Sequence, residues 1–450
     1  MYYLPPPAAL FHNRLLTLLV LRVDLDTGSS DFWVFSTLLR ADDQEKAKKK
    51  HTIFNHIKSK SWRWPSHEWG GFSKFWRFRR PSLEWEIEYG DGSSASGVVG
   101  FDDVLLGDIK ISKQAVQLAK RFSGRQFREG SADGILGLAF GHLNSVNAVI
   151  PDLIQTPLEN MRDQGKLSEH LFTVNFGRES FFTFGFIDEA TRAGRDIHYV
   201  DVDIKEGCWK FDSRYARVGG KLLNRKFGAA IADTGSNLIL THPQIVWMIY
   251  KRINGAKYDI NQPGWVYPSG AEIPEISFSV GEDENCMIEI NEHNMNHSEL
   301  GGGYVFGAVQ ENPAYENGGS QFDIFGTPFF RQIYAIFDIK GERFGLIKKE
   351  PEEIGKPEMR AFLVESPTKM DHIAEREEEE VEDSVDGSIR EEYPRRGSTL
   401  QTVMDVEETI REEDEVPTIK EEDEVTQIME ERETASPEEE LMEPRRTQHD

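Results

Sequence analysis

Two stretches of the chain repeat one pattern, in which an apolar segment, a short polar turn and a second apolar segment follow one another. The first covers residues 23–35 and the second covers residues 230–240. In both, the turn reads Asp-Thr-Gly-Ser and begins at Asp26 or at Asp233. Glycine lets a chain reverse tightly, and short apolar segments bounded by turn residues are typical of strands. The pattern therefore predicts two strand–turn–strand units, each with an acidic side chain at its turn.

Regular alternation of apolar and polar residues predicts a hairpin between these two units. Residues 83–89 alternate as a half-buried strand does, residues 90–94 form a turn of glycine, aspartate and serine, and residues 96–101 return. Two further strands are expected over residues 171–176 and 182–188. Helices are expected over residues 157–167 and 243–252.

An internal duplication is predicted from the order of the motifs. Each half holds one Asp-Thr-Gly turn and, later, one apolar-apolar-glycine segment, at residues 135–137 and 324–326. The same order in both halves indicates two related units, although few residues are identical.

The apolar residues 15–21 allow two interpretations. They follow Arg14 and resemble the short apolar core of a signal peptide. They also run directly into the strand that carries Asp26, which favours a buried strand. We expect the strand.

The negative charge of the protein is concentrated at its C-terminus. Residues 351–450 hold 34 acidic and 12 basic residues, a net charge of −22 out of −26 for the 450 residues, which leaves −4 for residues 1–350. So high a charge with few aromatic residues predicts a disordered acidic tail. Most such tails stay solvated; the alternative is a segment that binds an unknown partner.

Residues 41–80 are basic and rich in tryptophan. Such a mixture can mark a nucleic-acid surface, yet the stretch shows neither a recognisable nucleic-acid fold nor a strand period. We expect an atypical basic insertion, and no nucleic acid as a partner.

Cysteine and histidine are too few or too scattered for a disulfide framework or a metal site. Cys208 and Cys286 leave one bridge open as an alternative. Four histidines show no zinc-ligand spacing and are expected at the surface: His12, His51, His56 and His67. No apolar run approaches the ~18 residues of a membrane span. Neither metal nor cofactor is expected.

The repeated acids are the candidate chemistry. A carboxyl group between two apolar strands pays a desolvation cost unless it is hydrogen-bonded or shares a proton. Two such loops brought face to face would titrate as a pair, with one apparent pKa held low and the other raised. One member can then take a proton from water while the other donates one to a peptide carbonyl. Two unrelated surface turns are the alternative.

With these motifs the chain resembles the pepsin-like aspartic endopeptidases over residues 21–348, and its hairpin sequence at residues 89–97 resembles the fungal branch. The resemblance implies an all-β, bilobal fold with few short helices and an active-site cleft between the lobes. It places an N-terminal lobe at residues 1–188 and a C-terminal lobe at residues 189–350, before the tail. It also implies a monomer that cleaves peptide or protein substrates, and a secreted or vacuolar location, although the chain shows no clear signal peptide.

The resemblance implies roles for the matching residues. The catalytic pair is Asp26 and Asp233, and the supports of their loops are Thr27, Gly28, Ser29, Thr234, Gly235 and Ser236. The hairpin matches the mobile flap over the cleft, and the flap and substrate-binding residues are Tyr89, Gly90, Asp91, Ser93, Trp33 and Phe127. The reaction implied is peptide-bond hydrolysis by a water activated between the two acids at acidic pH, with bulky hydrophobic residues beside the scissile bond.

A different class of function is the alternative: an inactive peptide-binding or scaffold protein built on the same fold. It rests on the unusual N-terminus, the stretch 41–80, and the absence of a recognisable propeptide. Ser269 and Val305 also replace cysteines of a disulfide that many pepsin-like proteins have. Both Asp-Thr-Gly-Ser turns and Tyr89 are present, which favours the enzyme.

Overall fold

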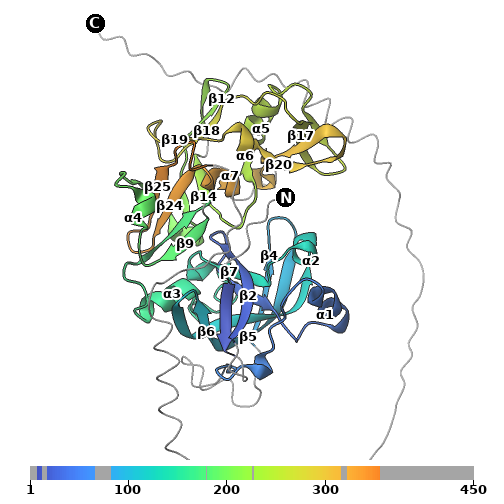
Figure 1. Cartoon of the computed structure of the whole chain (residues 1–450), viewed down its shortest axis with the longest axis vertical. Coiled ribbons are helices and arrows are strands. Elements are labelled where there is room, and N and C mark those ends of the chain that lie inside the picture. The colour runs from blue at the N-terminus through green and yellow to red at the C-terminus, as the bar shows by residue number, and fades with distance from the viewer. Residues whose placement is uncertain are drawn as a thin grey trace, which may run out of the picture. The chain divides into compact units, whose positions relative to one another are not determined.

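The computed structural model describes residues 8–12, 18–65, 83–178, 180–225, 228–315 and 322–354. These residues form mostly strands with a few short helices. Figure 1 shows the blue and cyan strands of the first half grouped in one lobe and most of the green, yellow and orange strands of the second half in another. The all-β, two-lobed architecture expected from the sequence is confirmed.

The first lobe is built on a seven-stranded sheet in which β1 also pairs with β5. In spatial order its strands are β1 (Ala8–His12), β2 (Leu18–Asp26), β7 (Gly134–Gly137), β3 (Phe32–Phe35), β6 (Ile109–Ser123), β5 (Ser94–Leu106) and β4 (Glu84–Glu88). The strand expected over residues 15–21 is confirmed from Leu18 onward, and residues 15–17 lie outside the described part.

A five-stranded sheet of the second lobe repeats the central part of this arrangement. Its order is β11 (Lys210–Asp212), β14 (Ala229–Ala232), β23 (Asp323–Phe325), β15 (Ile239–Thr241) and β22 (Val309–Glu311). In both lobes the strand before the Asp-Thr-Gly turn pairs in parallel with the apolar-apolar-glycine strand, and the strand after the turn pairs antiparallel with it. The predicted duplication is therefore present in the topology.

Two four-stranded sheets complete the second lobe. One consists of β13 (Lys221–Asn224), β12 (Tyr215–Val218), β18 (Ile276–Ser279) and β19 (Met287–Glu289). The other consists of β16 (Lys257–Asp259), β17 (Gly264–Pro268), β21 (Tyr304–Gly307) and β20 (Asn296–Glu299).

A further sheet combines strands from both halves of the sequence. Its order is β10 (His198–Asp201), β25 (Arg343–Lys348), β24 (Ile333–Asp338), β8 (Leu171–Asn175) and β9 (Phe181–Phe184). The rings of Phe172 on β8 and Phe337 on β24 stack at 4.5 Å, so packing as well as pairing joins the halves. The lobe boundary at residue 188 stays a prediction.

The helices are short and lie between strands along the chain. They are α1 (Ala41–Lys48), α2 (Arg125–Glu129), α3 (Pro157–Asp163), α4 (Glu189–Arg192), α5 (Pro243–Tyr250), α6 (Glu292–Met295) and α7 (Thr327–Phe330), with 3₁₀ turns η1 (His56–Lys58), η2 (Gly141–Leu143), η3 (Ile204–Glu206), η4 (Gly301–Gly303) and η5 (Pro313–Tyr315). The expected helices over 157–167 and 243–252 are confirmed in shorter form. Thr156 and Glu159 form a capping box that starts α3.

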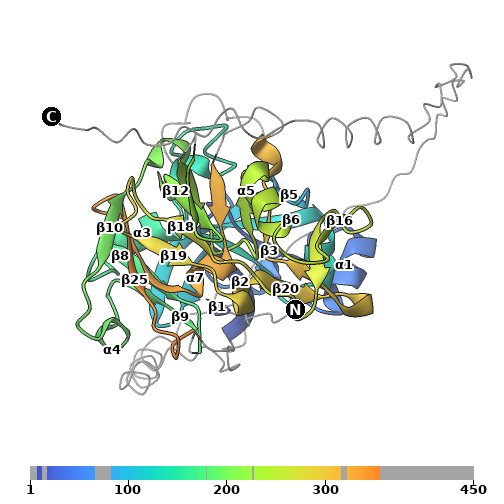
Figure 2. The same cartoon turned by 90° about the horizontal axis from the view of Figure 1, so that it is seen from above.

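Residues 41–65 are an ordered part of the first lobe, and the interpretation of residues 41–80 as an insertion stays a prediction. Helix α1 lies on the outer side of this lobe, away from β24 and β25 in both views (Figures 1 and 2). Phe54 and Trp62 are buried, and Arg63 bridges to Phe101 on β5. These long-range contacts position the segment in the lobe, and no local hydrophobic periodicity of its sequence does so. Residues 66–80 lie outside the described residues.

Two of the four histidines correct the expectation that all four lie at the surface. His51 and His56 are buried, not at the surface, and burial lowers the pKa of each. The side chains of His12 and His67 lie outside the described residues. Within the described chain, no group of three or more histidine, cysteine or acidic side chains is arranged to hold a metal ion.

The open question of a disulfide is answered: Cys208 and Cys286 are both buried free thiols. Among the described residues, no helix is both long and apolar enough to cross a membrane. Of the acidic tail, residues 355–450 lie outside the described part.

Candidate active site

The two Asp-Thr-Gly-Ser turns meet, although 207 residues separate their threonines in sequence. Asp26 ends β2, and Asp233 directly follows β14. Each aspartate is tied through its backbone to the apolar-apolar-glycine segment of its own lobe. The Leu138 N–H donates to the Asp26 carbonyl at 2.7 Å, and the Asp233 N–H donates to the Phe325 carbonyl at 3.0 Å. Each turn is therefore supported by that segment of its own lobe.

Thr27 and Thr234 bind the turns to each other in a reciprocal pattern. Thr27 Oγ1 donates to the Ala232 carbonyl at 2.8 Å and accepts from the Thr234 N–H at 2.9 Å. Thr234 Oγ1 donates to the Leu25 carbonyl at 2.6 Å and accepts from the Thr27 N–H at 3.1 Å. Both threonines are buried, so all four bonds are shielded from water. The relative position of the two aspartates is thus held by paired hydrogen bonds.

Backbone amides and a hydroxyl orient the two carboxyl groups. The Gly28 N–H and Ser29 Oγ donate to Asp26 at 2.8 and 2.5 Å. The Gly235 N–H donates to Asp233 Oδ1 at 2.9 Å. Ser236 differs from Ser29 in that it approaches Asp233 through its backbone N–H. Its own carbonyl accepts from Thr327, which joins this turn to α7.

Glycine is required at two positions because each turn lies against the carboxyl group of the other. A Cβ on Gly28 would lie 2.5 Å from Asp233 Oδ1, and one on Gly235 would overlap Asp26 Oδ1. Real Cβ atoms do not come so close to such neighbours. These glycines therefore allow the close approach of the two acids.

Electrostatics favour one shared proton on this pair. Burial first, and then the adjacent Asp26 carboxyl with its hydrogen bond, raise the pKa of Asp233 well above its usual range. Two carboxyl groups in contact cannot both ionise cheaply, so the proton belongs to the pair. This arrangement can supply one acid and one base at the same place.

The turn between β4 and β5 is the predicted flap, and Tyr89 connects it to Trp33. Tyr89 Oη accepts from Trp33 Nε1 at 2.8 Å, and the ring of Phe127 packs edge-on against both side chains. Burial raises the pKa of Tyr89, so its hydroxyl stays protonated. The three aromatic residues predicted separately from the sequence are thus brought together.

The tip of the flap is ordered by its own polar groups. The Ser93 N–H and Oγ donate to Asp91 Oδ1 at 2.9 and 2.6 Å, and Gln126 Nε2 donates to Ser93 Oγ at 2.7 Å. Gly90 belongs to the same turn, and a Cβ there would meet nothing within 4 Å. Steric fit therefore does not require glycine at position 90, and its role in binding stays a prediction.

The sequence interpretation missed two acids beside the pair. Burial, with smaller contributions from Asp26 and Asp133, raises the pKa of Asp24 to about 7. Asp31 is fully buried and accepts from Gln117 and Ser145. Asp24 is a polar residue at an apolar position of the repeat, a signal that would have identified it.

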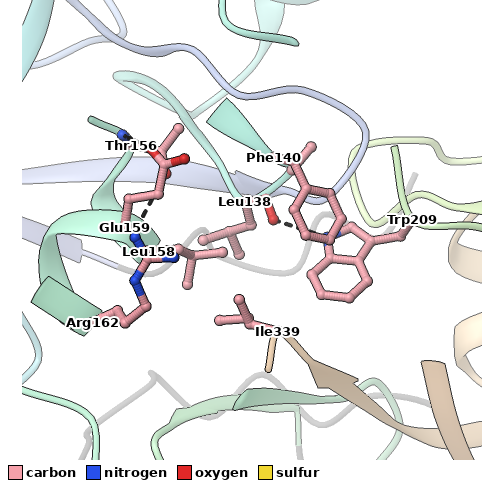
Figure 3. Close-up of a pocket in the computed structure, with 9 residues that line it drawn as sticks. Leu138, Phe140, Thr156, Leu158, Glu159, Arg162, Trp209 and Ile339 are labelled. Carbon is pink, nitrogen blue, oxygen red and sulfur yellow. Dashed lines mark hydrogen bonds between the residues drawn. The ribbon is translucent and has the colours of Figure 1, made fainter. Parts of the chain in front are cut away.

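A small pocket lies behind the Asp26 turn, between α3 and Trp209 (Figure 3). Its volume of about 50 Å³ is too small for a peptide, because a single bound water already occupies on the order of 10–15 Å³ on this measure. Its lining residues are Leu138, Ala139, Phe140, Thr156, Leu158, Glu159, Arg162, Trp209 and Ile339. Neither catalytic candidate lines it, so it is not a substrate site.

Comparison with known proteins agrees with this geometry. The family described as eukaryotic aspartyl protease matches residues 19–349. The chain belongs to this family. Aspergillopepsin-1 of Aspergillus pseudoglaucus is 32% identical over 327 residues, which is 72% of this chain and 75% of that protein. Penicillopepsin-1 of Penicillium rubens is 32% identical over 327 residues, 72% of this chain and 74% of that protein. The protein is thus an aspartic endopeptidase of the pepsin-like class, a hydrolase that acts on peptides.

Replacement of either turn glycine by alanine is expected to reduce kcat of this aspartyl protease by about 10²-fold. The added Cβ would push the opposite carboxyl group away, and a misplacement of ~1 Å can cost ~10²-fold in rate. Gly28→Ala and Gly235→Ala are compared by steady-state hydrolysis of a quenched peptide. Gly301→Ala is the matched control, because a Cβ there meets nothing within 4 Å. Wild-type kcat in both turn variants would contradict the steric argument.

Tyr89→Phe is expected to lower kcat/KM of the protease by about tenfold. The change removes the acceptor of the Trp33 N–H and leaves a buried donor unpaired, which costs ~1–3 kcal/mol. Trp33→Phe removes the other partner, so the double variant should lose little more than either single variant. Additive losses in this double-mutant cycle would show that the two residues act separately.

Proposed function

We propose that Asp26 and Asp233 hydrolyse peptide bonds through a water molecule bound between them, at acidic pH. The ionised member of the pair takes a proton from the water as it attacks the peptide carbonyl. The protonated member donates a hydrogen bond and then its proton to the carbonyl oxygen. As the tetrahedral intermediate collapses, one of its hydroxyl groups returns a proton to the ionised acid while the protonated acid gives its proton to the leaving nitrogen. The C–N bond breaks, and the pair again shares one proton.

One observation carries this proposal: each carboxyl group lies against the glycine of the other turn, within a reciprocal set of hydrogen bonds from both turns. Donors around each acid are fixed before substrate arrives, which lowers the reorganisation needed during reaction. Which aspartate starts ionised is a property of the pair. No group other than the two acids and a water is needed for the step.

Substrate preference is proposed from the wall beside the flap. Tyr89 is partly exposed, and the buried rings of Trp33 and Phe127 pack behind it. Aromatic surface of this kind favours bulky hydrophobic side chains on both sides of the scissile bond. The flap residues Gly90, Asp91 and Ser93 would bond the substrate backbone. Closure of the hairpin would exclude water and hold the peptide in place.

The test is cleavage of two peptides across the acidic range by the full chain. The peptides differ only at the two residues that flank the bond, an aromatic pair in one and a serine pair in the other. A bell-shaped dependence of kcat on pH, with higher kcat/KM for the aromatic pair, is expected. Cleavage that increases toward neutral pH, or no cleavage by a folded chain, would overturn the mechanism; the second result would favour the inactive scaffold.

A further inference from the structure

Trp209 connects the two halves of the active site, although it lies outside the residues to which the mechanism assigns a role. It directly precedes β11, and its side chain is 1% exposed. Its Nε1–H donates to the Leu138 carbonyl of the first lobe at 3.0 Å. Its own carbonyl accepts from the Ala232 N–H of the second lobe at 3.0 Å. Figure 3 shows the indole next to Leu138, with this first bond dashed.

Each of these two hydrogen bonds ends on a residue that is directly connected to a catalytic candidate. The Leu138 N–H donates to the Asp26 carbonyl, and Ala232 is the residue before Asp233. A path of three hydrogen bonds thus joins the backbones of the two acids through one indole. This path meets the Thr27–Thr234 bonds only at the backbone of Ala232, whose carbonyl accepts from Thr27 Oγ1.

Aromatic rings pack against the indole, which also borders a small pocket. The rings of Phe140, Phe172 and Phe337 lie 4.6, 5.8 and 5.0 Å from the indole, measured between ring centroids. The pocket described above borders it as well, opposite Leu158 and Ile339 (Figure 3). A void supplies no contacts to the atoms that line it. The Nε1 bond is therefore needed to fix the orientation of the ring on that side.

We propose that Trp209 is a positioning residue that sets the separation of the Asp26 and Asp233 carboxyl groups. This inference rests on the proposed mechanism, in which the two acids act as a coupled pair. Coulomb energy varies inversely with distance, so a separation that grows by ~1 Å weakens the coupling by about a fifth to a quarter. The two apparent pKa values of the pair would then approach each other by about half a unit, and the pH range of kcat would narrow.

Other ionisable groups near the pair stay unchanged in the test. They are Asp24, Asp31, Tyr89 and Cys208, each of which interacts electrostatically with Asp26 or Asp233. Their contributions are present in the wild type and in every variant. A change in the profile on replacement of Trp209 therefore reports the pair.

The experiment compares Trp209→Phe with Trp265→Phe in the full chain. Trp265 also stacks on an aromatic ring, that of Tyr250, and also donates its Nε1–H, to Glu311 in the second lobe at 3.0 Å. It therefore controls for the loss of an indole and of one hydrogen bond. The readouts are kcat and KM for the aromatic-pair peptide at each pH, with the thermal midpoint of unfolding for both variants.

Trp209→Phe is expected to lower kcat by about 10- to 100-fold, to leave KM within about twofold, and to narrow the pH profile of kcat by about half a unit in total. Trp265→Phe should keep the wild-type profile even if its thermal midpoint falls equally. A normal profile for Trp209→Phe, or the same narrowing in both variants, would overturn the proposal. A wild type without a bell-shaped profile would instead contradict the proposed mechanism.

A second measurement needs no variant of Trp209 to fold. In the full chain with ¹⁵N-labelled tryptophan, the Trp209 indole N–H should shift with pH at the apparent pKa values of the pair, because the bond path carries the change to it. Its NMR signal is identified in Phe140→Leu, which removes a neighbouring ring but keeps the Nε1 bond. The indole N–H signal of Trp265 should not shift at the apparent pKa values of the pair. A Trp209 indole N–H signal whose chemical shift does not change at these pKa values would also overturn the proposal.

Discussion

Asp26→Asn and Asp233→Asn are each expected to lower kcat by at least ~10²–10⁴-fold, the usual contribution of general acid–base catalysis. Asparagine keeps the shape and the bonds from Gly28 and Gly235, but it cannot exchange a proton with water. The two acids work as one unit, so the double variant should be no slower than either single variant. The measurement is hydrolysis of the aromatic-pair peptide at the pH of highest wild-type kcat.

Asp108→Asn is the matched control for these variants, because Asp108 lies exposed in the turn between β5 and β6. Its kcat should equal that of the wild type. Near-ultraviolet circular dichroism shows whether each variant keeps its tertiary packing. A folded Asp26→Asn or Asp233→Asn with more than about a tenth of wild-type kcat would exclude the shared-proton mechanism.

The folded protein is expected to lose stability as pH rises from about 4 to about 7, and Asp24→Asn should remove part of that loss. Burial raises the pKa of Asp24 to about 7, whereas an unfolded aspartate has a pKa of ~3.9. Between these values the folded chain holds a proton that the unfolded chain has released. Stability from this proton is complete below the unfolded pKa and disappears as pH rises through the folded pKa.

The size of the effect follows from the shift. About three pKa units at ~1.4 kcal/mol each give a loss on the order of 4 kcal/mol from Asp24 as an upper limit. Asp233 and Asp31 act in the same direction, since burial raises the pKa of both. Burial lowers the pKa of His51 and of His56. These two residues therefore make the protein more stable as pH rises toward their usual pKa, which is the opposite effect. The difference between wild type and Asp24→Asn cancels these other groups.

The measurement is the free energy of unfolding from denaturant titrations at a series of pH values, for wild type and Asp24→Asn. The free energy of unfolding of Asp24→Asn, relative to that of the wild type, should increase steadily as pH rises toward 7. Lys349, whose pKa is lowered to about 7 by burial, changes stability mainly above this range. Parallel curves for the two proteins would show that Asp24 titrates normally.

The sequence determined the parts of the site that local chemistry specifies. An Asp-Thr-Gly-Ser turn between apolar segments requires a tight reversal wherever it occurs, and the alternation at residues 83–89 requires a half-buried strand. The repeat of the turn predicted the duplication and the pairing of Asp26 with Asp233, and the alternation predicted the hairpin that the family resemblance identifies with the flap. The reciprocal bonds of Thr27 and Thr234 agree with that interpretation.

Only the tertiary structure decided the features that depend on partners far away in sequence. His51 and Phe54 look like parts of a polar, irregular stretch, yet contacts with Asp133 and with β3 bury them. Asp24 has a raised pKa because folding surrounds it with apolar groups and other acids. Trp209 joins the two turns through Leu138 and Ala232, 71 and 23 residues away. Burial and long-range hydrogen bonds arise from the packing of both lobes, and no local pattern of residues contains them.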